Sequence, residues 1–205
     1  MELAQERELK YKELCTRCKG DIEAYLYDCD GTLADNMQAH KDAYIRIAKE
    51  QGLEIDGTII DELAGWPTVE VVAEMNRRHN TNFDTEDFAR RKSLAFYETI
   101  DQTQPIDFVM KHLTHAPAHI KIGVVSGGRR ETVTKTLKIL GIDHLVQALV
   151  CAGDTERGKP APDPFLLAAN HLGVAPEKCI VFEDGEAGVQ SAIAAGMKWI
   201  RIDKI

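Results

Sequence analysis

The sequence lacks several features that define particular protein classes. No apolar run approaches the roughly 18 residues that a membrane-spanning helix needs, so we expect no membrane partner. The five cysteines are odd in number and scattered, unlike a disulfide framework. Basic residues are outnumbered, 25 against 33 acidic ones, and the net charge of −8 disfavours nucleic acid as a partner. The first 20 residues are highly charged and have no apolar centre, unlike a secretory signal. We therefore expect a cytoplasmic protein.

The composition is that of an ordinary globular chain. Its 205 residues are 44% hydrophobic and 28% charged, which excludes a wholly disordered or fibrous protein. Since domains commonly have about 150 residues, this length predicts one domain, or one domain with a small insertion. The sequence does not determine the oligomeric state, and we expect a monomer or a weak homodimer.

Five short apolar runs predict buried strands. They are rich in β-branched residues and cover residues 24–28, 120–125, 148–151, 179–182 and 198–202. The last four alternate with helical patterns over 129–140, 164–172 and 186–195, each of which stops at a glycine. This alternation predicts an α/β fold with a Rossmann-like, three-layer core, in which helices cover both faces of a parallel sheet.

About ninety residues separate the first two predicted strands, far more than one crossover needs. The interval has helical patterns over 37–51, 69–78 and 86–100, with polar breaks near 35–36 and 102–105. We therefore predict an all-helical cap domain, residues 36–104, inserted into a discontinuous core of residues 21–35 and 105–205. Residues 1–20 would form a charged N-terminal extension or helix.

Polar residues capable of catalysis follow the predicted strands. The first strand runs into Asp-Cys-Asp-Gly-Thr, and the later candidates also stand at or near strand ends. Taken singly, each has an ordinary explanation as turn chemistry or a surface charge. Ligands of open parallel sheets bind outside the carboxyl ends of the strands, so these groups can converge on one crevice. In chain order they are Asp28, Asp30, Ser126, Lys159, Glu183 and Asp184.

In this order the residues resemble the four motifs of the haloacid dehalogenase-like superfamily. The resemblance covers nearly the whole chain from Tyr25, and residues 159–163 and 181–184 look like the branch that contains β-phosphoglucomutase and sugar-phosphate phosphatases. That branch has a helical cap inserted after the first motif. The resemblance implies a phosphoric monoester hydrolase, in which Asp28 attacks phosphorus to form an aspartyl-phosphate and Asp30 transfers protons.

The remaining core residues would bind either the phosphate group or a metal ion that balances the negative charge. Lys159 would supply positive charge, and Ser126 with the backbone amide of Gly127 would donate hydrogen bonds to phosphate oxygens. Several carboxylates around a phosphate dianion repel one another, and a hard divalent cation, Mg²⁺, offsets this. The resemblance implies side-chain ligation by Asp28 and Asp184 and ligation by the backbone carbonyl of Asp30. Glu183 belongs to the same predicted metal site.

Cap residues are candidates for substrate binding. The loop that contains Gly65 and Trp66 resembles one that contacts substrate in related caps, although a Trp between helices is more often part of a core. Lys92 matches a substrate-facing lysine of the branch, the alternative being a surface charge. His40 matches a histidine at the start of such caps.

The predicted activity is hydrolysis of a small phosphorylated metabolite, and the resemblance implies a sugar phosphate. The first alternative is a phosphomutase of the β-phosphoglucomutase type, whose cap loop supplies an Arg where this chain has Thr68. The second is a non-catalytic, phosphate-switched binding module, which would be expected to have lost Asp28 or Asp30. Both aspartates are present, and the absence of the Arg favours hydrolysis over the mutase reaction.

Overall fold

A five-stranded parallel sheet forms the centre of the protein in the computed structural model, which describes residues 2–205. The strand order is β5–β4–β1–β6–β7, with β1 in the middle. The strands are β1 (Ala24–Tyr27), β4 (Lys121–Val125), β5 (Ala148–Val150), β6 (Cys179–Glu183) and β7 (Lys198–Arg201). Each falls within one residue of a predicted segment, and the parallel pairing confirms the predicted α/β class.

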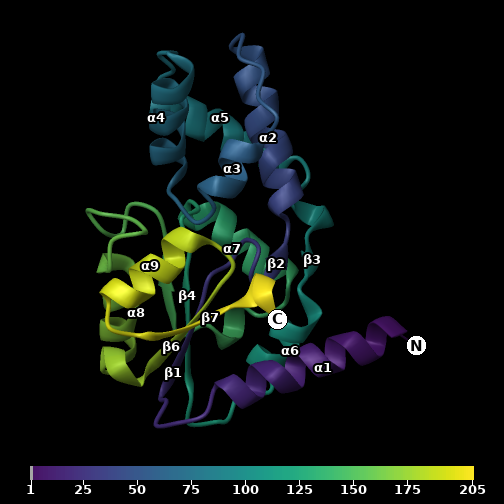
Figure 1. The fold of residues 1–205 in the computed structure, drawn as a ribbon, viewed down its shortest axis with the longest axis vertical. Helices are drawn as coiled ribbons and strands as arrows, with labels where there is room; N and C mark the ends of the chain where they lie inside the picture. The colour runs from purple at the N-terminus through teal and green to yellow at the C-terminus, as the bar shows by residue number, and fades with distance from the viewer. Residues whose placement is uncertain (1) are drawn as a thin grey trace.

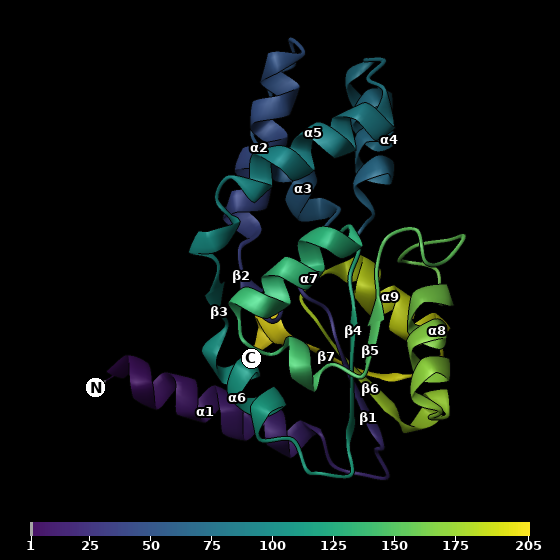
Figure 2. The ribbon, with the colours of Figure 1, turned by 180° about the vertical axis from the view of Figure 1, so that it is seen from behind.

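Helices cover both faces of this sheet, as Figures 1 and 2 show from opposite sides. One face carries α1 (Glu2–Arg17), α6 (Asp107–Thr114) and α7 (Arg130–Ile139), and the other carries α8 (Asp163–Leu172) and α9 (Glu186–Ala194). Strand β1 illustrates the reason. Its Tyr25 and Tyr27 belong to the first apolar cluster, and its Ala24 and Leu26 belong to the second. Successive side chains of a strand point to opposite faces, so a strand buried on both sides is apolar throughout.

The charged N-terminal segment is a helix that packs on the core. Leu14 of α1 is fully buried, and Glu8 pairs with Lys111 of α6 at 2.6 Å. Cys15 and Cys18, near the end of this segment, are free thiols. Met1 of the predicted extension lies outside the described residues. Within residues 2–205, no helix has the length and apolar character needed to cross a membrane.

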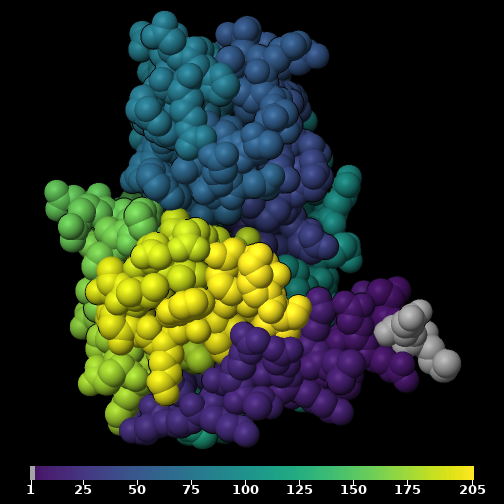
Figure 3. Space-filling view, viewed as in Figure 1, coloured from purple at the N-terminus to yellow at the C-terminus, as the bar shows by residue number. Residues whose placement is uncertain are grey.

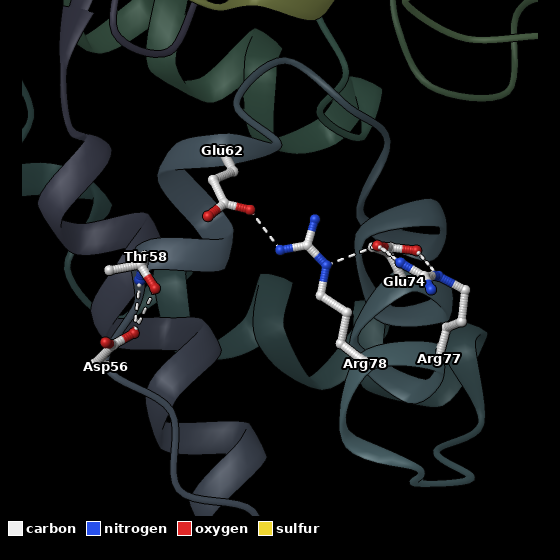
Figure 4. Close-up of polar contacts among 6 residues, drawn as sticks. All are labelled: Asp56, Thr58, Glu62, Glu74, Arg77 and Arg78. Carbon is white, nitrogen blue, oxygen red and sulfur yellow. Dashed lines mark hydrogen bonds and ion pairs between the residues drawn. The ribbon is translucent and has the colours of Figure 1, made fainter.

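The insertion forms a separate helical layer beyond the carboxyl ends of the core strands (Figures 1 and 3). It contains α2 (Met37–Glu50), α3 (Thr58–Glu62), α4 (Thr68–His79) and α5 (Thr85–Tyr97), which share their own apolar cluster. Arg78 of α4 links two of these helices, contacting Glu74 on its own helix at 2.6 Å and Glu62 on α3 (Figure 4). Helix α3 was not predicted, because five residues are too few to show a helical period.

Both connections between the cap and the core run side by side. Strand β2 (Ala34–Asp35) pairs antiparallel with β3 (Gln104–Pro105), Ala34 opposite Pro105. The sequence showed these segments only as polar breaks, because a two-residue strand has no readable period and its partner is distant in sequence. The cap is thus attached through one narrow ribbon, while its residue boundaries remain a prediction. In the described part of the chain, 3₁₀ turns also lie at Ile100–Gln102, Asp143–Leu145, Pro176–Lys178 and Ile202–Lys204.

Candidate active site

The predicted core residues meet at the carboxyl edge of the sheet. Asp28 directly follows β1, and its backbone N–H donates to the carbonyl of Phe182 on β6 at 2.9 Å. Glu183 ends β6, and Ser126 directly follows β4. Because β4, β1 and β6 are adjacent and parallel, their carboxyl ends place these residues next to one another.

Lys159 is the buried cation of this group, with 2% of its surface exposed. Its ammonium donates to Asp28 Oδ1 at 2.7 Å, to Glu183 Oε1 at 2.6 Å and to the carbonyl of Val125 at 2.8 Å. These contacts use all three donors of a lysine. Burial alone would lower the pKa of Lys159, but the charges of Asp28 and Glu183 outweigh it and hold the pKa above its usual value. Lys159 is therefore a fixed positive charge beside Asp28.

Negative charge exceeds positive charge in this group. Carboxylate oxygens of Asp28, Glu183 and Asp184 all lie within 4.8 Å of one another. Burial raises the pKa of Asp28; Lys159 opposes this shift, and the other two carboxylates add to it. Burial and the charge of Glu183 likewise raise the pKa of Asp184 to about 7. When all three carboxyls are ionised, they exceed the one ammonium by two negative charges, which a divalent, oxygen-preferring cation would balance.

Two neighbours shape the Asp184 side of this cluster. The hydroxyl of Thr32 donates to Asp184 Oδ1 at 3.0 Å. Gly31 has a φ of 88°, and a Cβ there would overlap the Asp184 carboxylate, so the turn after Asp30 requires glycine for both reasons. Glu183 is already engaged, since its Oε2 accepts from the Gly185 amide at 2.8 Å.

The side chain of Asp30 points away from the carboxylate cluster and toward the cap. Its Oδ1 accepts a hydrogen bond from Asn36 Nδ2 at 2.6 Å and lies 3.3 Å from His40 Nε2. Burial would raise the pKa of Asp30, but the contacts with His40 and Asn36 more than offset it, and the pKa falls to about 2. The two aspartates of the first motif thus face different parts of the site.

Lys92 and His40 form a buried pair inside the cap. Lys92 Nζ lies 2.6 Å from His40 Nδ1, and both residues are buried. The ammonium also lies 4.7 Å from the ring centre of Tyr44, and the His40 ring stacks on Phe96 at 3.9 Å. This placement excludes the alternative that Lys92 is a surface charge.

A cavity of about 70 Å³ separates the cap from these core residues. The core side contributes Asp28, Asp30 and Ser126, whose Oγ accepts from the Gly128 amide at 3.0 Å. The lining residues contributed by the cap and by the segment after Ser126 include the predicted Gly65, Trp66, His40, Lys92 and Gly127. A larger space of about 400 Å³ adjoins it, and Ser126, Gly127 and Lys159 also line that space.

Sequence reasoning missed three residues with direct contacts to the predicted ones. Tyr44 lines the cavity, and a signal existed, because it lies four residues after His40 and so on the same face of α2. Thr32 belongs to the Asp-Cys-Asp-Gly-Thr run but had no assigned role. No sequence pattern indicated a role for Asn36, since polar residues are common between a strand and a helix.

Comparisons with known proteins identify relatives of this chain. The family model for haloacid dehalogenase-like hydrolases matches residues 25–202. Fructose-1-phosphate phosphatase YqaB of Escherichia coli is 32% identical over 174 residues, covering 84% of this chain and 92% of the relative. β-Phosphoglucomutase of Bacillus subtilis is 29% identical over 187 residues, covering 86% and 81%. The structure of a hydrolase from Pseudomonas syringae matches with a TM-score of 0.81 at 22% identity, covering 87% and 84%.

Proposed function

Because the chain belongs to the haloacid dehalogenase-like hydrolase family, we propose that it is a Mg²⁺-dependent phosphatase for small phosphorylated metabolites of the sugar-phosphate class. The observation that carries this proposal is the division of labour between the two aspartates. Asp28 lies beside Lys159 at 2.7 Å, whereas Asp30 faces the cavity between core and cap. One carboxylate is thus placed for attack on phosphorus and the other for proton transfer to a leaving group.

In the proposed reaction, Asp28 attacks phosphorus, the bond from phosphorus to the leaving oxygen breaks, and an aspartyl-phosphate forms. Asp30 donates a proton to the departing alkoxide and then takes one from the water that hydrolyses the aspartyl-phosphate. A carboxyl with a pKa of about 2 is ionised in the free protein. A phosphate dianion next to Asp30 would raise the pKa of that carboxyl through like charge and so favour the protonated form when substrate binds.

The metal site follows from the excess negative charge. Asp28 and Asp184 would hold Mg²⁺ by their side chains and Asp30 by its backbone carbonyl, and the bound ion would supply positive charge next to the phosphate oxygens. Glu183 adds charge to the site and positions Lys159 through the contact at 2.6 Å. Ser126 and the Gly127 amide would donate hydrogen bonds to the phosphate.

The residues that line the cavity favour hydrolysis over the phosphomutase reaction. A mutase must hold a bisphosphate intermediate in two orientations, so its cap needs a cation for the distal phosphate. Among the cavity-lining residues in the described part of the chain, Lys92 has the one ammonium, and it is engaged with His40. Arg129, which lines the neighbouring space, pairs with Glu86 at 3.0 Å. Thr68 provides no charge.

A substrate screen tests this proposal. The purified protein is incubated with sugar and polyol monophosphates, among them fructose 1-phosphate, with and without Mg²⁺, and released phosphate is measured. We expect release that requires Mg²⁺ and that falls below about a hundredth of the wild-type rate in Asp28→Asn, because an amide cannot attack phosphorus. Conversion of β-glucose 1-phosphate to glucose 6-phosphate without phosphate release would support a mutase. Phosphate binding without turnover of any substrate would support a binding module.

A further inference from the structure

The cap loop 64–67, between α3 and α4, lies directly against three glycines of the core. Gly127 follows Ser126, Gly158 precedes Lys159, and Gly185 follows Asp184. Three of the four loops that supply the predicted core residues thus each bring a glycine to the same segment of the cap. Figure 1 shows this segment reaching down from the helical layer toward the core.

Each of these contacts is too close for a side chain. A Cβ on Gly185 would lie 2.6 Å from the carbonyl oxygen of Ala64, and a Cβ on Gly127 would lie 2.8 Å from that of Gly65. A Cβ on Gly158 would overlap Cγ of the buried Pro67 and lie 3.1 Å from its Cδ. Non-bonded carbon atoms prefer about 3.5–4.0 Å, so a single methyl group forces the loop and the core apart.

Backbone conformation does not account for these glycines. None of the three has the positive φ that favours glycine; Gly185, for example, has φ −95° and ψ 145°, which any residue adopts. What glycine provides at these positions is space for the cap loop. By contrast, Gly65 of the loop itself has a φ of 88° and meets nothing closer than 3.7 Å.

We propose that Gly127, Gly158 and Gly185 form a seat for the cap loop and that Gly158 and Gly185 are positioning residues of the reaction. Their missing side chains let the cap approach until the Gly65 and Trp66 backbone meets the Gly127 loop, which closes the cavity around the leaving group. The consequence for catalysis rests on the proposed function. A cap held away by one methyl group would leave the phosphate-binding core intact but expose the cavity to water and displace Trp66 and Thr68.

Gly158→Ala tests the proposal because its methyl group would clash with the ring of Pro67, and a second substitution can remove that ring. We expect this variant to lower kcat/KM at least tenfold for the sugar phosphate hydrolysed fastest in the screen. Hydrolysis of p-nitrophenyl phosphate, which needs fewer cap contacts, should stay within threefold. Pro67→Ala removes the ring atoms, so Pro67→Ala/Gly158→Ala should return to within threefold of Pro67→Ala alone.

Gly185→Ala is the matched control for this rescue. Its methyl group would meet the main chain of Ala64, which Pro67→Ala does not remove, so Gly185→Ala should stay impaired in the Pro67→Ala background. Full sugar-phosphate activity in Gly158→Ala would overturn the proposal. So would failure of the rescue, or an equal loss on both substrates, which would indicate damage to Lys159 rather than to cap closure.

Trp66 fluorescence tests the seat without any turnover. The chain has two tryptophans, so Trp199→Phe isolates the signal of Trp66. In that background, Gly158→Ala should increase the quenching of Trp66 by acrylamide, and adding Pro67→Ala should reverse the increase, with circular dichroism confirming the fold. Equal quenching in all variants of an active protein would refute the seat. If the wild type hydrolyses no phosphate ester but the quenching pattern holds, the proposed function fails and the seat stands.

Discussion

Lys92 donates to His40 Nδ1 across 2.6 Å, and this contact orients the His40 ring relative to Asp30. Because Nδ1 accepts a hydrogen bond from the ammonium, the neutral ring carries its proton on Nε2, which lies 3.3 Å from Asp30 Oδ1. Lys92 on α5 therefore sets the tautomer of His40 on α2, the residue next to Asp30. Packing of Lys92 against Tyr44 and of His40 against Phe96 holds the pair in place.

The first prediction concerns the proton-transfer role of Asp30. Asp30→Asn should slow hydrolysis of a sugar phosphate about 100-fold or more, because an alkoxide leaves poorly without protonation. The loss should be far smaller for p-nitrophenyl phosphate, whose leaving group needs little protonation. Steady-state kinetics on both substrates measures the difference, and equal losses would remove Asp30 from this role.

The second prediction is a dependence on pH that originates at Lys92. Burial lowers the pKa of Lys92 to about 8, with the Asp30 charge opposing the shift, so the side chain is charged below pH 8 and neutral above it. If the charge is required, kcat/KM for a sugar phosphate falls about fivefold between pH 8 and pH 9. Lys92→Arg keeps its charge at these pH values and should lose this alkaline decline, whatever its absolute rate. A decline unchanged in Lys92→Arg would assign it to another group.

The third prediction concerns the metal. Chelation by EDTA should abolish turnover, Mg²⁺ should restore it, and excess Ca²⁺ should inhibit, because Ca²⁺ accepts looser coordination by the same carboxylates. Phosphate release from p-nitrophenyl phosphate is a sufficient assay, since the prediction concerns the core. Full activity after exhaustive chelation would contradict the proposed site.

The fourth prediction concerns stability and the N-terminal helix. Leu14 of α1 is fully buried in the core cluster, whereas Leu9 of the same helix is 67% exposed. Leu14→Ala should lower the free energy of unfolding by about 2–4 kcal/mol. Leu9→Ala serves as the control and should stay within about 0.5 kcal/mol of wild type. Urea denaturation measures both; equal effects would mean that α1 is not docked on the core in solution.

Much of the core architecture could be predicted from local pattern. Apolar runs of four to six residues alternating with helices dictate a parallel sheet, and a parallel sheet brings all its carboxyl ends to one edge. The residues after β1, β4 and β6 could therefore be predicted to be neighbours, although Asp28 and Asp184 lie near opposite ends of the sequence. The sequence by itself determined the α/β class of the fold and indicated that a helical insertion follows the first strand.

Only the tertiary structure decided how the cap meets this cluster. No local pattern shows that Lys92 is buried against His40, because the two residues are 52 positions apart on different helices and a lysine on a helix is usually exposed. Nor could the sequence explain Gly158 and Gly185. A glycine that makes room for a neighbouring loop cannot be distinguished, in the sequence, from a glycine required by a turn. Contacts between two domains depend on their relative placement, and that placement is set by packing across the interface rather than by the propensities of either segment.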